Sequence, residues 1–440
     1  MSSQTIAPAA EDRPHLKLRD CYWFFVPLVL MVELNMISKS VIHAFLARTE
    51  SPSVTLAAFN AAFTFYFALT STTEVTTLLS LSYFKARADI PRILGFMALV
   101  LLAPLTIAGV VCFTTFGNVV FGGWFGLGAQ AQAEARGAVG ALMLSAPFLL
   151  MRGTAFALLM LNRRTIVITA STLVRLFSLT ISLFLLPRWF SGAAVGAAAL
   201  MLCMVTEGIF AWANAWRYFM QLPAVRQGGE TLGTYWRFAW PLMINSSAEL
   251  GVIFVINLFL GRLSKAELAI AAFGVSHGLV SLMMAPLRNL TQTAQTLVTR
   301  REDVRVMLTF ASHLVAFFTV LAIVLFETPL RERILRGVMG LTPELAAYAE
   351  PAMIIAFVMA IFWGGTALFR GLLAKARATT SLAASGLLRI ATATVAGSLS
   401  LAHPEINGAL LGVAAWILSY ALETAISSWR LTKIGWYREG

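Results

Sequence analysis

Two stretches of the 440-residue chain carry one pattern: residues 21–48 read CYWFFVPLVLMVELNMISKSVIHAFLAR, and residues 235–262 read YWRFAWPLMINSSAELGVIFVINLFLGR. Each has a Pro-Leu pair near its start, ends on Phe-Leu-x-Arg, and is mostly apolar between them. A helix needs about 20 apolar residues to cross the hydrocarbon core of a bilayer. Each stretch therefore predicts a membrane-spanning helix, and the shared pattern predicts an internal repeat.

The repeat extends well beyond these two stretches. Corresponding residues lie 214 positions apart for Ala57-Ala58-Phe59 with Ala271-Ala272-Phe273, and for Ser171, Leu173 and Arg175 with Ser385, Leu387 and Arg389. The separation is 216 for Gly192-Ala193, Gly196 and Glu207 with Gly408-Ala409, Gly412 and Glu423. We read the Gly-x-x-x-Gly spacings as sites of close helix packing within each half. Charged residues that agree in register inside apolar segments are strong evidence for two homologous halves.

Composition places the whole chain in a membrane. It is 58% hydrophobic and 12% charged, whereas a soluble domain is about 25% charged. Hydropathy and turn signals predict twelve spans, near residues 21–46, 54–82, 93–116, 137–161, 165–186, 191–216, 238–260, 267–288, 306–327, 349–372, 381–402 and 407–430. The predicted fold is an all-α membrane protein with twelve transmembrane helices.

The spans and their flanking charges define domains and topology. Since six is an even number, both halves enter the membrane in the same orientation, which gives a parallel pseudo-twofold repeat. We expect these segments: a cytoplasmic N-terminal segment 1–20, an N-lobe 21–216, a cytoplasmic linker 217–237, a C-lobe 238–430 and a cytoplasmic tail 431–440. With both termini inside, the inner segments hold more than twice as many Lys and Arg as the outer ones, which supports this orientation.

Several function classes are not indicated. The net charge of +12 is spread between spans rather than gathered with aromatic residues, so nucleic-acid binding is not expected. Three scattered cysteines predict neither a disulfide framework nor a zinc site. The Gly274-to-Gly278 segment fits the nucleophile-elbow spacing but lies in a span, where that motif has no strand-turn-helix context. We expect no enzyme activity, catalytic residue, metal site or bound cofactor.

Eleven charged residues lie inside the predicted spans: Glu33, Lys39, Glu74, Arg152, Arg175, Glu207, Glu249, Arg288, Arg370, Arg389 and Glu423. A charge at the bilayer centre costs about 2.5–3.5 kcal/mol on insertion scales. These residues must therefore pair with one another or face water.

Depth along the helices predicts which of them pair. Arg175 and Glu207 each lie roughly 15 Å from the cytoplasmic surface at 1.5 Å per helical residue, and Arg389 and Glu423 stand in the same relation. We expect two ion pairs, one in each half. A pair present in both halves is best explained as scaffold, with a role in a substrate cavity as the second choice.

The remaining charged residues do not recur between the halves. We expect Lys39, Arg152, Arg288 and Arg370 to bind an anionic substrate, because guanidinium groups offer paired donors to carboxylate or phosphate. Glu33, Glu74 and Glu249 are the candidates to carry a coupling proton. The alternative is that Glu74, Arg288 and Arg370, near the cytoplasmic ends of their spans, extend to the interface.

Certain motifs resemble one known family. Phe24-Phe25-Val26-Pro27-Leu28, Trp240-Pro241-Leu242, Leu388-Arg389-Ile390, Gly408-Ala409, Gly412 and Glu423 resemble the progressive ankylosis protein family and its bacterial relatives, within the multidrug/oligosaccharidyl-lipid/polysaccharide exporter superfamily. Thr72-Thr73-Glu74 departs from that family's Gly-Pro turn. The resemblance implies a V-shaped transporter of the bacterial inner membrane, with two lobes around a central cavity.

The resemblance and the charges together predict a secondary active transporter. The leading hypothesis is export of organic or phosphate-containing anions, such as citrate, pyrophosphate or nucleotides, by alternating access. The alternatives are a multidrug antiporter coupled to protons or sodium, and a flippase for lipid-linked sugars. We expect a monomer whose partners are a small anionic substrate and the lipid bilayer, with H⁺ or Na⁺ as coupling ion.

Overall fold

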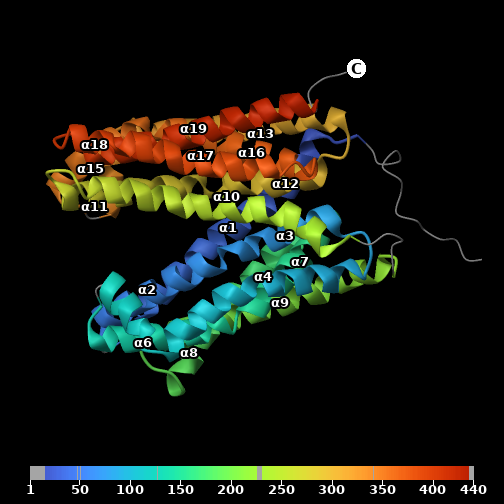
Figure 1. The fold of residues 1–440 in the computed structure, drawn as a ribbon, viewed down its shortest axis with the longest axis horizontal. Coiled ribbons are helices and arrows are strands. Elements are labelled where there is room, and N and C mark those ends of the chain that lie inside the picture. Colours follow the sequence, from blue (N-terminus) through green and yellow to red (C-terminus); the bar gives the residue numbers. More distant parts are fainter. Residues whose placement is uncertain are drawn as a thin grey trace, which may run out of the picture. The chain divides into compact units, whose positions relative to one another are not determined.

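The computed structural model describes residues 15–46, 48–49, 51–125, 127–224, 230–339 and 341–435, apart from the side chains of residues 36, 39, 40, 52, 53, 266, 267 and 271. The described chain forms two compact units. The N unit is Val26–Ser247, and the C unit is the described part of Met1–Phe25 together with Ala248–Gly440. Figure 1 shows that both units are built from long helices.

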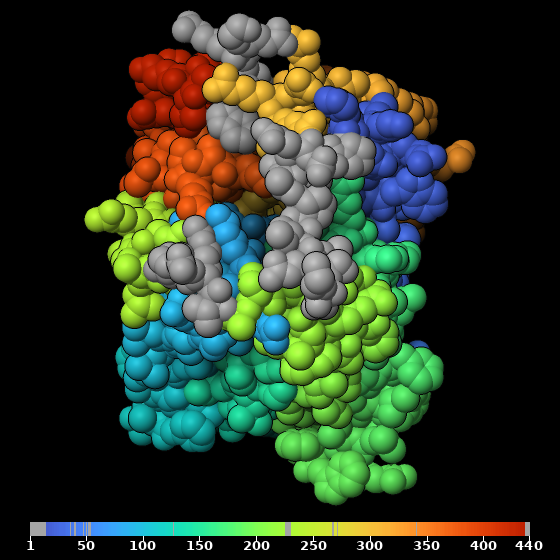
Figure 2. Space-filling view, turned by 90° about the vertical axis from the view of Figure 1, so that its right-hand side faces the viewer, coloured from blue at the N-terminus to red at the C-terminus, as the bar shows by residue number. Residues whose placement is uncertain are grey.

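The first half of the chain contains the following helices: α1 (Leu18–Leu46), α2 (Pro52–Thr70), the 3-10 turn η2 (Ser71–Glu74), α3 (Val75–Tyr83), α4 (Asp89–Phe113), α5 (Phe116–Asn118), the π turn η3 (Val119–Trp124), α6 (Ala129–Met143), α7 (Ala146–Leu161), α8 (Thr165–Leu185), the 3-10 turn η4 (Leu186–Arg188) and α9 (Ala193–Gln221). In Figure 2 the green residues around η4 form the lowest part of the N unit.

The second half contains α10 (Leu232–Leu260), α11 (Ala266–Met284), the 3-10 turn η5 (Ala285–Asn289), α12 (Leu290–Leu297), α13 (Arg301–Phe326), α14 (Leu330–Glu332), the π turn η6 (Arg333–Val338), α15 (Pro343–Ile355), the 3-10 turn η7 (Ala356–Val358), α16 (Met359–Lys375), α17 (Thr380–Gly397), α18 (Leu399–Ala402) and α19 (Gly408–Ile434). The order of long helices and short turns thus parallels that of the first half.

These helices correspond to the predicted spans. Among the described residues, ten are long and apolar enough to cross a membrane, and the bent pair α6–α7 makes an eleventh. The 29-residue helix α1 coincides with the first predicted span. The prediction of an all-α, multi-pass membrane protein is confirmed.

The second and eighth spans are both broken at the same place in the repeat. The turn η2 interrupts the second span and η5 interrupts the eighth. In η5 the break follows from Pro286, which has no N–H to donate. In η2 the hydroxyls of Ser71 and Thr73 instead donate to the carbonyls of Ala68 and Thr70, competing with the helical backbone bonds. Glu74 and Arg288 therefore lie in turns rather than in regular helix.

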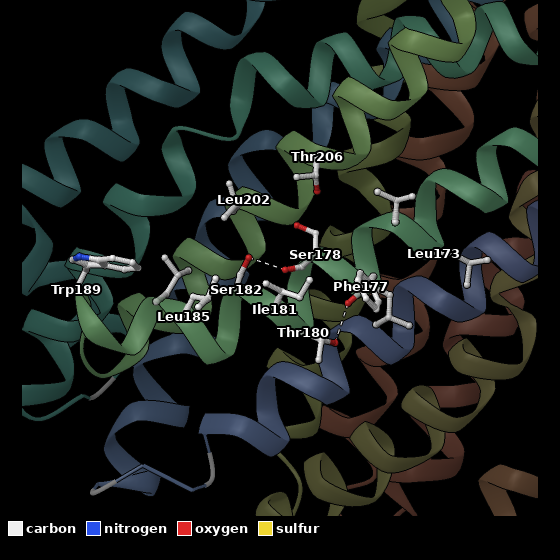
Figure 3. Close-up of a pocket in the computed structure, with 13 residues that line it drawn as sticks. Leu173, Phe177, Ser178, Thr180, Ile181, Ser182, Leu185, Trp189, Leu202 and Thr206 are labelled. Carbon is white, nitrogen blue, oxygen red and sulfur yellow. Dashed lines mark hydrogen bonds between the residues drawn. The ribbon is translucent and has the colours of Figure 1, made fainter.

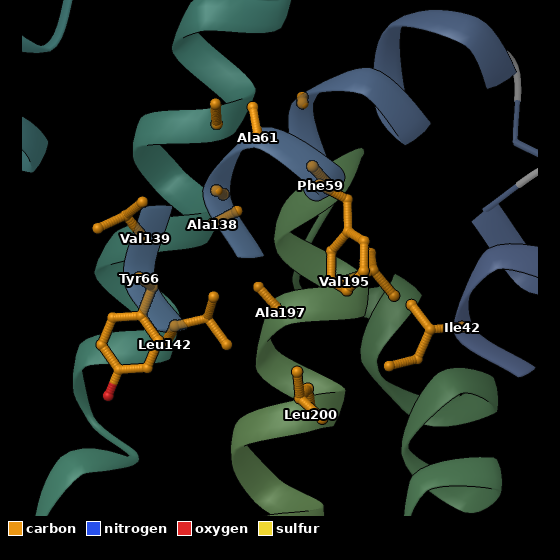
Figure 4. Close-up of a cluster of buried hydrophobic side chains, with 14 of the residues drawn as sticks. Ile42, Phe59, Ala61, Tyr66, Ala138, Val139, Leu142, Val195, Ala197 and Leu200 are labelled. Carbon is orange, nitrogen blue, oxygen red and sulfur yellow. The ribbon is translucent and has the colours of Figure 1, made fainter. Parts of the chain in front are cut away.

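Glycines bring helices into close contact at repeat-related positions. A Cβ on Gly196 of α9 would lie 3.0 Å from Cγ2 of Ile42, and one on Gly412 of α19 would lie 2.6 Å from Cδ2 of Phe273. Figure 4 shows Ile42 and Phe59 in the apolar core of the N unit around α9. The predicted close packing at these glycines is confirmed.

Two buried aspartates organise equivalent loops, a feature that the sequence analysis did not single out. Asp89 at the start of α4 accepts hydrogen bonds from the N–H groups of Lys85 (3.1 Å) and Ala86 (2.8 Å). Asp303 at the start of α13 accepts them from the N–H groups of Thr299 (2.9 Å) and Arg300 (2.8 Å). All three pairs of equivalent residues obey the offset of 214. Each carboxylate satisfies backbone donors that the chain reversal leaves without helical partners.

We predict that Asp303→Ala lowers the thermal stability of the protein more than Asp89→Ala. Asp303 also accepts bonds from the Thr299 hydroxyl (2.9 Å) and, more weakly, from the Leu16 N–H (3.4 Å). Loss of a capping side chain costs about 0.5–2 kcal/mol, so we expect Asp303→Ala near the upper end of that range. Thermal unfolding of the two variants in detergent measures the difference, and equal stabilities would contradict this assignment.

Candidate functional site

A glutamate with two arginines lies inside the N unit. Glu207 on α9 has no solvent exposure. Its Oε2 atom lies 2.8 Å from Nη1 of Arg152 on α7 and 3.5 Å from Nη1 of Arg175 on α8. The Thr172 hydroxyl donates to the other carboxylate oxygen at 3.1 Å, and Arg175 also donates to Oδ1 of Asn35 on α1 at 2.8 Å. The predicted ion pair between Arg175 and Glu207 is present.

The C unit contains the corresponding cluster. Glu423 on α19 and Arg389 on α17 are both fully buried, with Nη1 and Oε2 3.1 Å apart. Arg370 on α16 reaches Oε1 of the same glutamate at 3.4 Å, and the Ser385 hydroxyl approaches it at 3.5 Å. The Arg389 guanidinium also lies 4.8 Å from the ring centre of Tyr420. The second predicted ion pair is therefore present as well.

Arg152 and Arg370, which do not align in the repeat, have equivalent partners in the two units. Each adds a second guanidinium to the repeat-related glutamate of its own unit. Sequence alignment separated them because, at the offset of 214, Arg152 corresponds to Thr366, which is four positions before Arg370, or about 6 Å along a helix at 1.5 Å per residue. Long arginine side chains reach the same carboxylate from different turns of α7 and α16. With side-chain exposures of 25% and 18%, these two arginines are mainly inside their units.

The structure also brings together two residues that the sequence analysis placed in separate roles. Glu249 on α10 accepts a hydrogen bond from Nη2 of Arg288 in η5. Unlike the deeper clusters, this ion pair is accessible, because the side chains of Arg288 and Glu249 are 50% and 23% exposed. The Arg288 guanidinium lies 5.3 Å from the ring centre of Trp363 on α16. A buried aromatic ring thus supports the exposed guanidinium.

Aromatic and histidine side chains pack behind this ion pair. His277 on α11 lies 4.6 Å from Trp416, and Trp363 lies 5.6 Å from Trp416, measured between ring centres. Trp363, Trp416 and Tyr420 are all buried. The sequence analysis did not assign Trp363, Trp416 or Tyr420 to a site, because aromatic residues in a span are common and carry no pattern of their own.

The repeat places different residues at the equivalent positions of the N unit. By the repeat offsets, Glu249 corresponds to Asn35, and Arg288 corresponds to Glu74. His277 corresponds to Phe63, and Trp416 corresponds to Leu200. The uncharged Asn35 side chain accepts a hydrogen bond from Arg175 instead of forming an ion pair. The half-exposed ion pair with its aromatic support is therefore a feature of the C unit, whereas the buried clusters are common to both.

Positive charge exceeds negative charge at both clusters. The N-unit residues are Arg152 and Arg175 against Glu207, and the C-unit residues are Arg288, Arg370 and Arg389 against Glu249 and Glu423. Each set therefore carries one more guanidinium than carboxylate. Arginine in such a setting is well suited to bind a carboxylate or phosphate group.

The other predicted site residues lie elsewhere or outside the described atoms. Glu33 is a half-buried residue of α1 for which the described part of the structure gives no hydrogen bond or ion pair. Glu74 is half-buried in η2. The side chain of Lys39 lies outside the described residues. Convergence of all these residues on one cavity stays a prediction.

A pocket of about 850 Å³ lies along α8, η4 and α9 of the N unit (Figure 3). Its lining is mostly apolar, including Phe177, Ile181 and Trp189. The hydroxyls of Thr180 and Ser182, which also line it, donate to carbonyls of their own helix. None of the predicted site residues with described side chains lines this pocket, and its apolar lining suits hydrocarbon rather than an ion.

The described residues contain no candidate metal site, meaning a group of three or more His, Cys, Asp or Glu side chains that could hold a metal ion. No protein-family model matches the sequence, and no curated protein matches it.

Solved structures do share its fold. A eukaryotic MATE transporter, AtDTX14, is 11% identical and has a TM-score of 0.73, with 95% of this chain and 96% of that chain covered. A multidrug resistance MATE family transporter of the MOP superfamily, in an outward-facing conformation, is 13% identical with a TM-score of 0.68 over 96% and 97% of the two chains. A MOP superfamily transporter from Pyrococcus furiosus, described as having a binding pocket of reversed polarity, is 12% identical with a TM-score of 0.67 over 95% and 96%.

These similarities establish the fold of MATE transporters over nearly the whole chain. The resemblance to the wider exporter superfamily agrees with them at the level of fold. The narrower resemblance to the progressive ankylosis family is not supported by these comparisons.

Proposed function

We propose that the protein is a secondary active transporter that moves its substrate by alternating access. The main support is the shared fold with MATE transporters over about 95% of the chain. The charged clusters add a second argument, because ionisable residues inside spans are costly and mark transport pathways in many membrane proteins.

Two substrate classes have support: the compounds carried by multidrug antiporters, and anions. The similar solved structures favour a multidrug antiporter coupled to protons or sodium, since one of them is described as a multidrug resistance transporter. The surplus of one guanidinium in each unit favours a substrate with an anionic group. An organic compound that combines an apolar body with an anionic group satisfies both arguments.

The coupling ion would be carried by a carboxylate that changes its access to water. Glu249 is suited to this role because it is partly exposed, and Glu33 because it is half-buried without an ion pair in the described structure. In keeping with the predicted topology, we place the protein in the bacterial inner membrane as a monomer with both termini in the cytoplasm.

Reconstitution into liposomes tests this function. We expect a pH or sodium gradient to drive flux of a radiolabelled substrate, and expect dissipation of the gradient with an ionophore to reduce that flux at least tenfold. One set of liposomes carries organic anions (citrate, pyrophosphate and an aromatic sulfonate), and the matched set carries a cationic dye. Flux of the dye alone would favour the multidrug antiporter over the anion exporter, whereas gradient-independent flux of every compound would contradict secondary transport.

A further inference from the structure

We infer that Arg288 binds the anionic group of the substrate in the C unit by displacing Glu249, and that Glu249 then takes up one proton. This inference rests on the proposed transport function and assigns to it a subsite and a coupling step. It makes anion binding and protonation one linked event.

The accessibility of the ion pair selects Arg288 among the arginines of the C unit. Its side chain is 50% exposed, whereas Arg370 is 18% exposed and Arg389 is fully buried. A substrate can therefore reach Arg288 without opening the packing of α16, α17 and α19. Arg389 and Arg370 are also held by Glu423, which has no exposure and cannot move aside into solvent.

The support beneath Arg288 keeps its guanidinium in place during an exchange of partners. The guanidinium lies 5.3 Å from the centre of the buried Trp363 ring. The face of an aromatic ring attracts a cation placed above it. When Glu249 leaves, the planar donors of Arg288 remain presented to a carboxylate, phosphate or sulfonate. The ion pair thus resembles a site already occupied by an internal anion, the Glu249 carboxylate.

The repeat supports a role specific to this half of the chain. A structural ion pair is expected to recur, as Arg175–Glu207 and Arg389–Glu423 do. The positions equivalent to Glu249 and Arg288 are Asn35 and Glu74, which cannot form the same pair. A transporter that binds one substrate at a time needs such a site only once.

Charge balance requires a compensating event when the anion arrives. The anion accepts N–H hydrogen bonds from Arg288, the Glu249 carboxylate loses that partner, and a proton from water converts it to the neutral acid. No covalent bond to the substrate forms, and the added negative charge is matched by the added proton. For a monovalent anion, the net charge of the site is then unchanged.

The surroundings of Glu249 decide how strong this linkage is. The charged and titratable groups close enough to act on it electrostatically are Arg288, Arg370, Arg389, His277 and Tyr420. Arg370 and Arg389 oppose protonation, but Glu423 offsets part of their field because it pairs with both. Coupling energies between linked sites commonly correspond to factors of 5–150 in affinity. Uptake of close to one proton per anion requires a coupling near the upper end of this range, and we expect about a hundredfold coupling between anion and proton.

The experiment measures anion binding and proton uptake on the purified, full-length protein in detergent. The probe is naphthalenesulfonate, whose charge is constant across the pH range used. In weakly buffered solution with a pH indicator, we expect uptake of up to one proton per bound anion. By titration calorimetry, we expect affinity to fall by up to about a hundredfold between pH 6 and pH 8, because uptake of one proton per anion changes affinity about tenfold per pH unit.

Two variants separate this mechanism from a structural role. Glu249→Gln removes the competing anion, so we expect binding at least as tight as the parent at pH 6, with no dependence on pH and no proton uptake. Arg288→Lys retains the charge but not the paired donors, and we expect a tenfold or greater loss of affinity. Glu350→Gln is the matched control, because it also removes a partly exposed carboxylate from an arginine, Arg331, outside the proposed site, and it should behave like the parent.

Some results would overturn the inference. They are absence of naphthalenesulfonate binding, or pH-dependent binding that persists in Glu249→Gln. Thermal unfolding and size-exclusion profiles establish that each variant is folded before its anion binding and proton uptake are measured. The transport function is judged separately: gradient-driven flux in liposomes by a protein that fails these binding tests would leave that proposal intact and remove only the Arg288 subsite.

Discussion

Glu423→Ala is expected to destabilise the protein by about 3–5 kcal/mol, the cost of removing one partner from a buried ion pair. Glu423 and Arg389 are both fully buried, and Arg370 approaches the same carboxylate. The substitution leaves two guanidinium groups inside the C unit without their shared counter-charge. Glu207→Ala should have a similar effect in the N unit, where Arg152 and Arg175 converge on one glutamate.

Thermal unfolding in detergent checks this expectation, with Glu249→Ala as the matched control. That substitution also removes a carboxylate from an arginine, but from a pair that is 50% and 23% exposed, so we expect a much smaller loss. In the double variant Glu423→Met/Arg389→Met, apolar side chains replace both buried charges, and stability should recover substantially. If Glu423→Ala and Glu249→Ala lose equal stability, the scaffold role of the buried cluster is wrong.

Gly371→Ala is the second substitution with a large expected effect. Gly371 on α16 packs against α12, and a Cβ there would lie 2.4 Å from the carbonyl oxygen of Thr291 and 3.0 Å from Cβ of Ala294. A backbone oxygen cannot rotate away as a flexible side chain does, so the two helices must separate. We expect a loss of about 1–3 kcal/mol, as for overpacking in other cores.

The same substitution at Gly274 is the control. An added Cβ at Gly274 of α11 meets nothing within 4 Å, and alanine in a helix is favoured over glycine by about 0.5–1 kcal/mol. Gly274→Ala should therefore leave stability unchanged or raise it. Thermal unfolding of both variants measures the difference. Equal stabilities of Gly371→Ala and Gly274→Ala would show that α12 and α16 are not in tight contact.

The sequence by itself determined the membrane-spanning helices, their repeat and two of the buried ion pairs. Apolar length predicts a span because the bilayer has a fixed thickness. Depth predicts Arg175–Glu207 and Arg389–Glu423 because each helical residue advances by about 1.5 Å. Residues on neighbouring helices at equal depth can pair, and these two pairs do.

Some features were present in the sequence but not recognised. Asp89 and Asp303 obey the same 214-residue offset as the spans, yet a carboxylate in a loop between spans does not stand out from its composition. Their role became visible only through the backbone N–H groups that they bind. Their shared offset shows that the repeat includes the loops between spans.

Only the tertiary structure decided which other charges meet. Arg152 and Arg370 were assigned to substrate because they are out of register, but their side chains are long enough to reach one glutamate from different helical turns. The contact between Glu249 and Arg288 depends on how η5 bends the eighth span and which face α10 presents to it. Sequence fixes depth along each helix, whereas rotation about the helix axis and the reach of a side chain are set by packing against neighbouring helices.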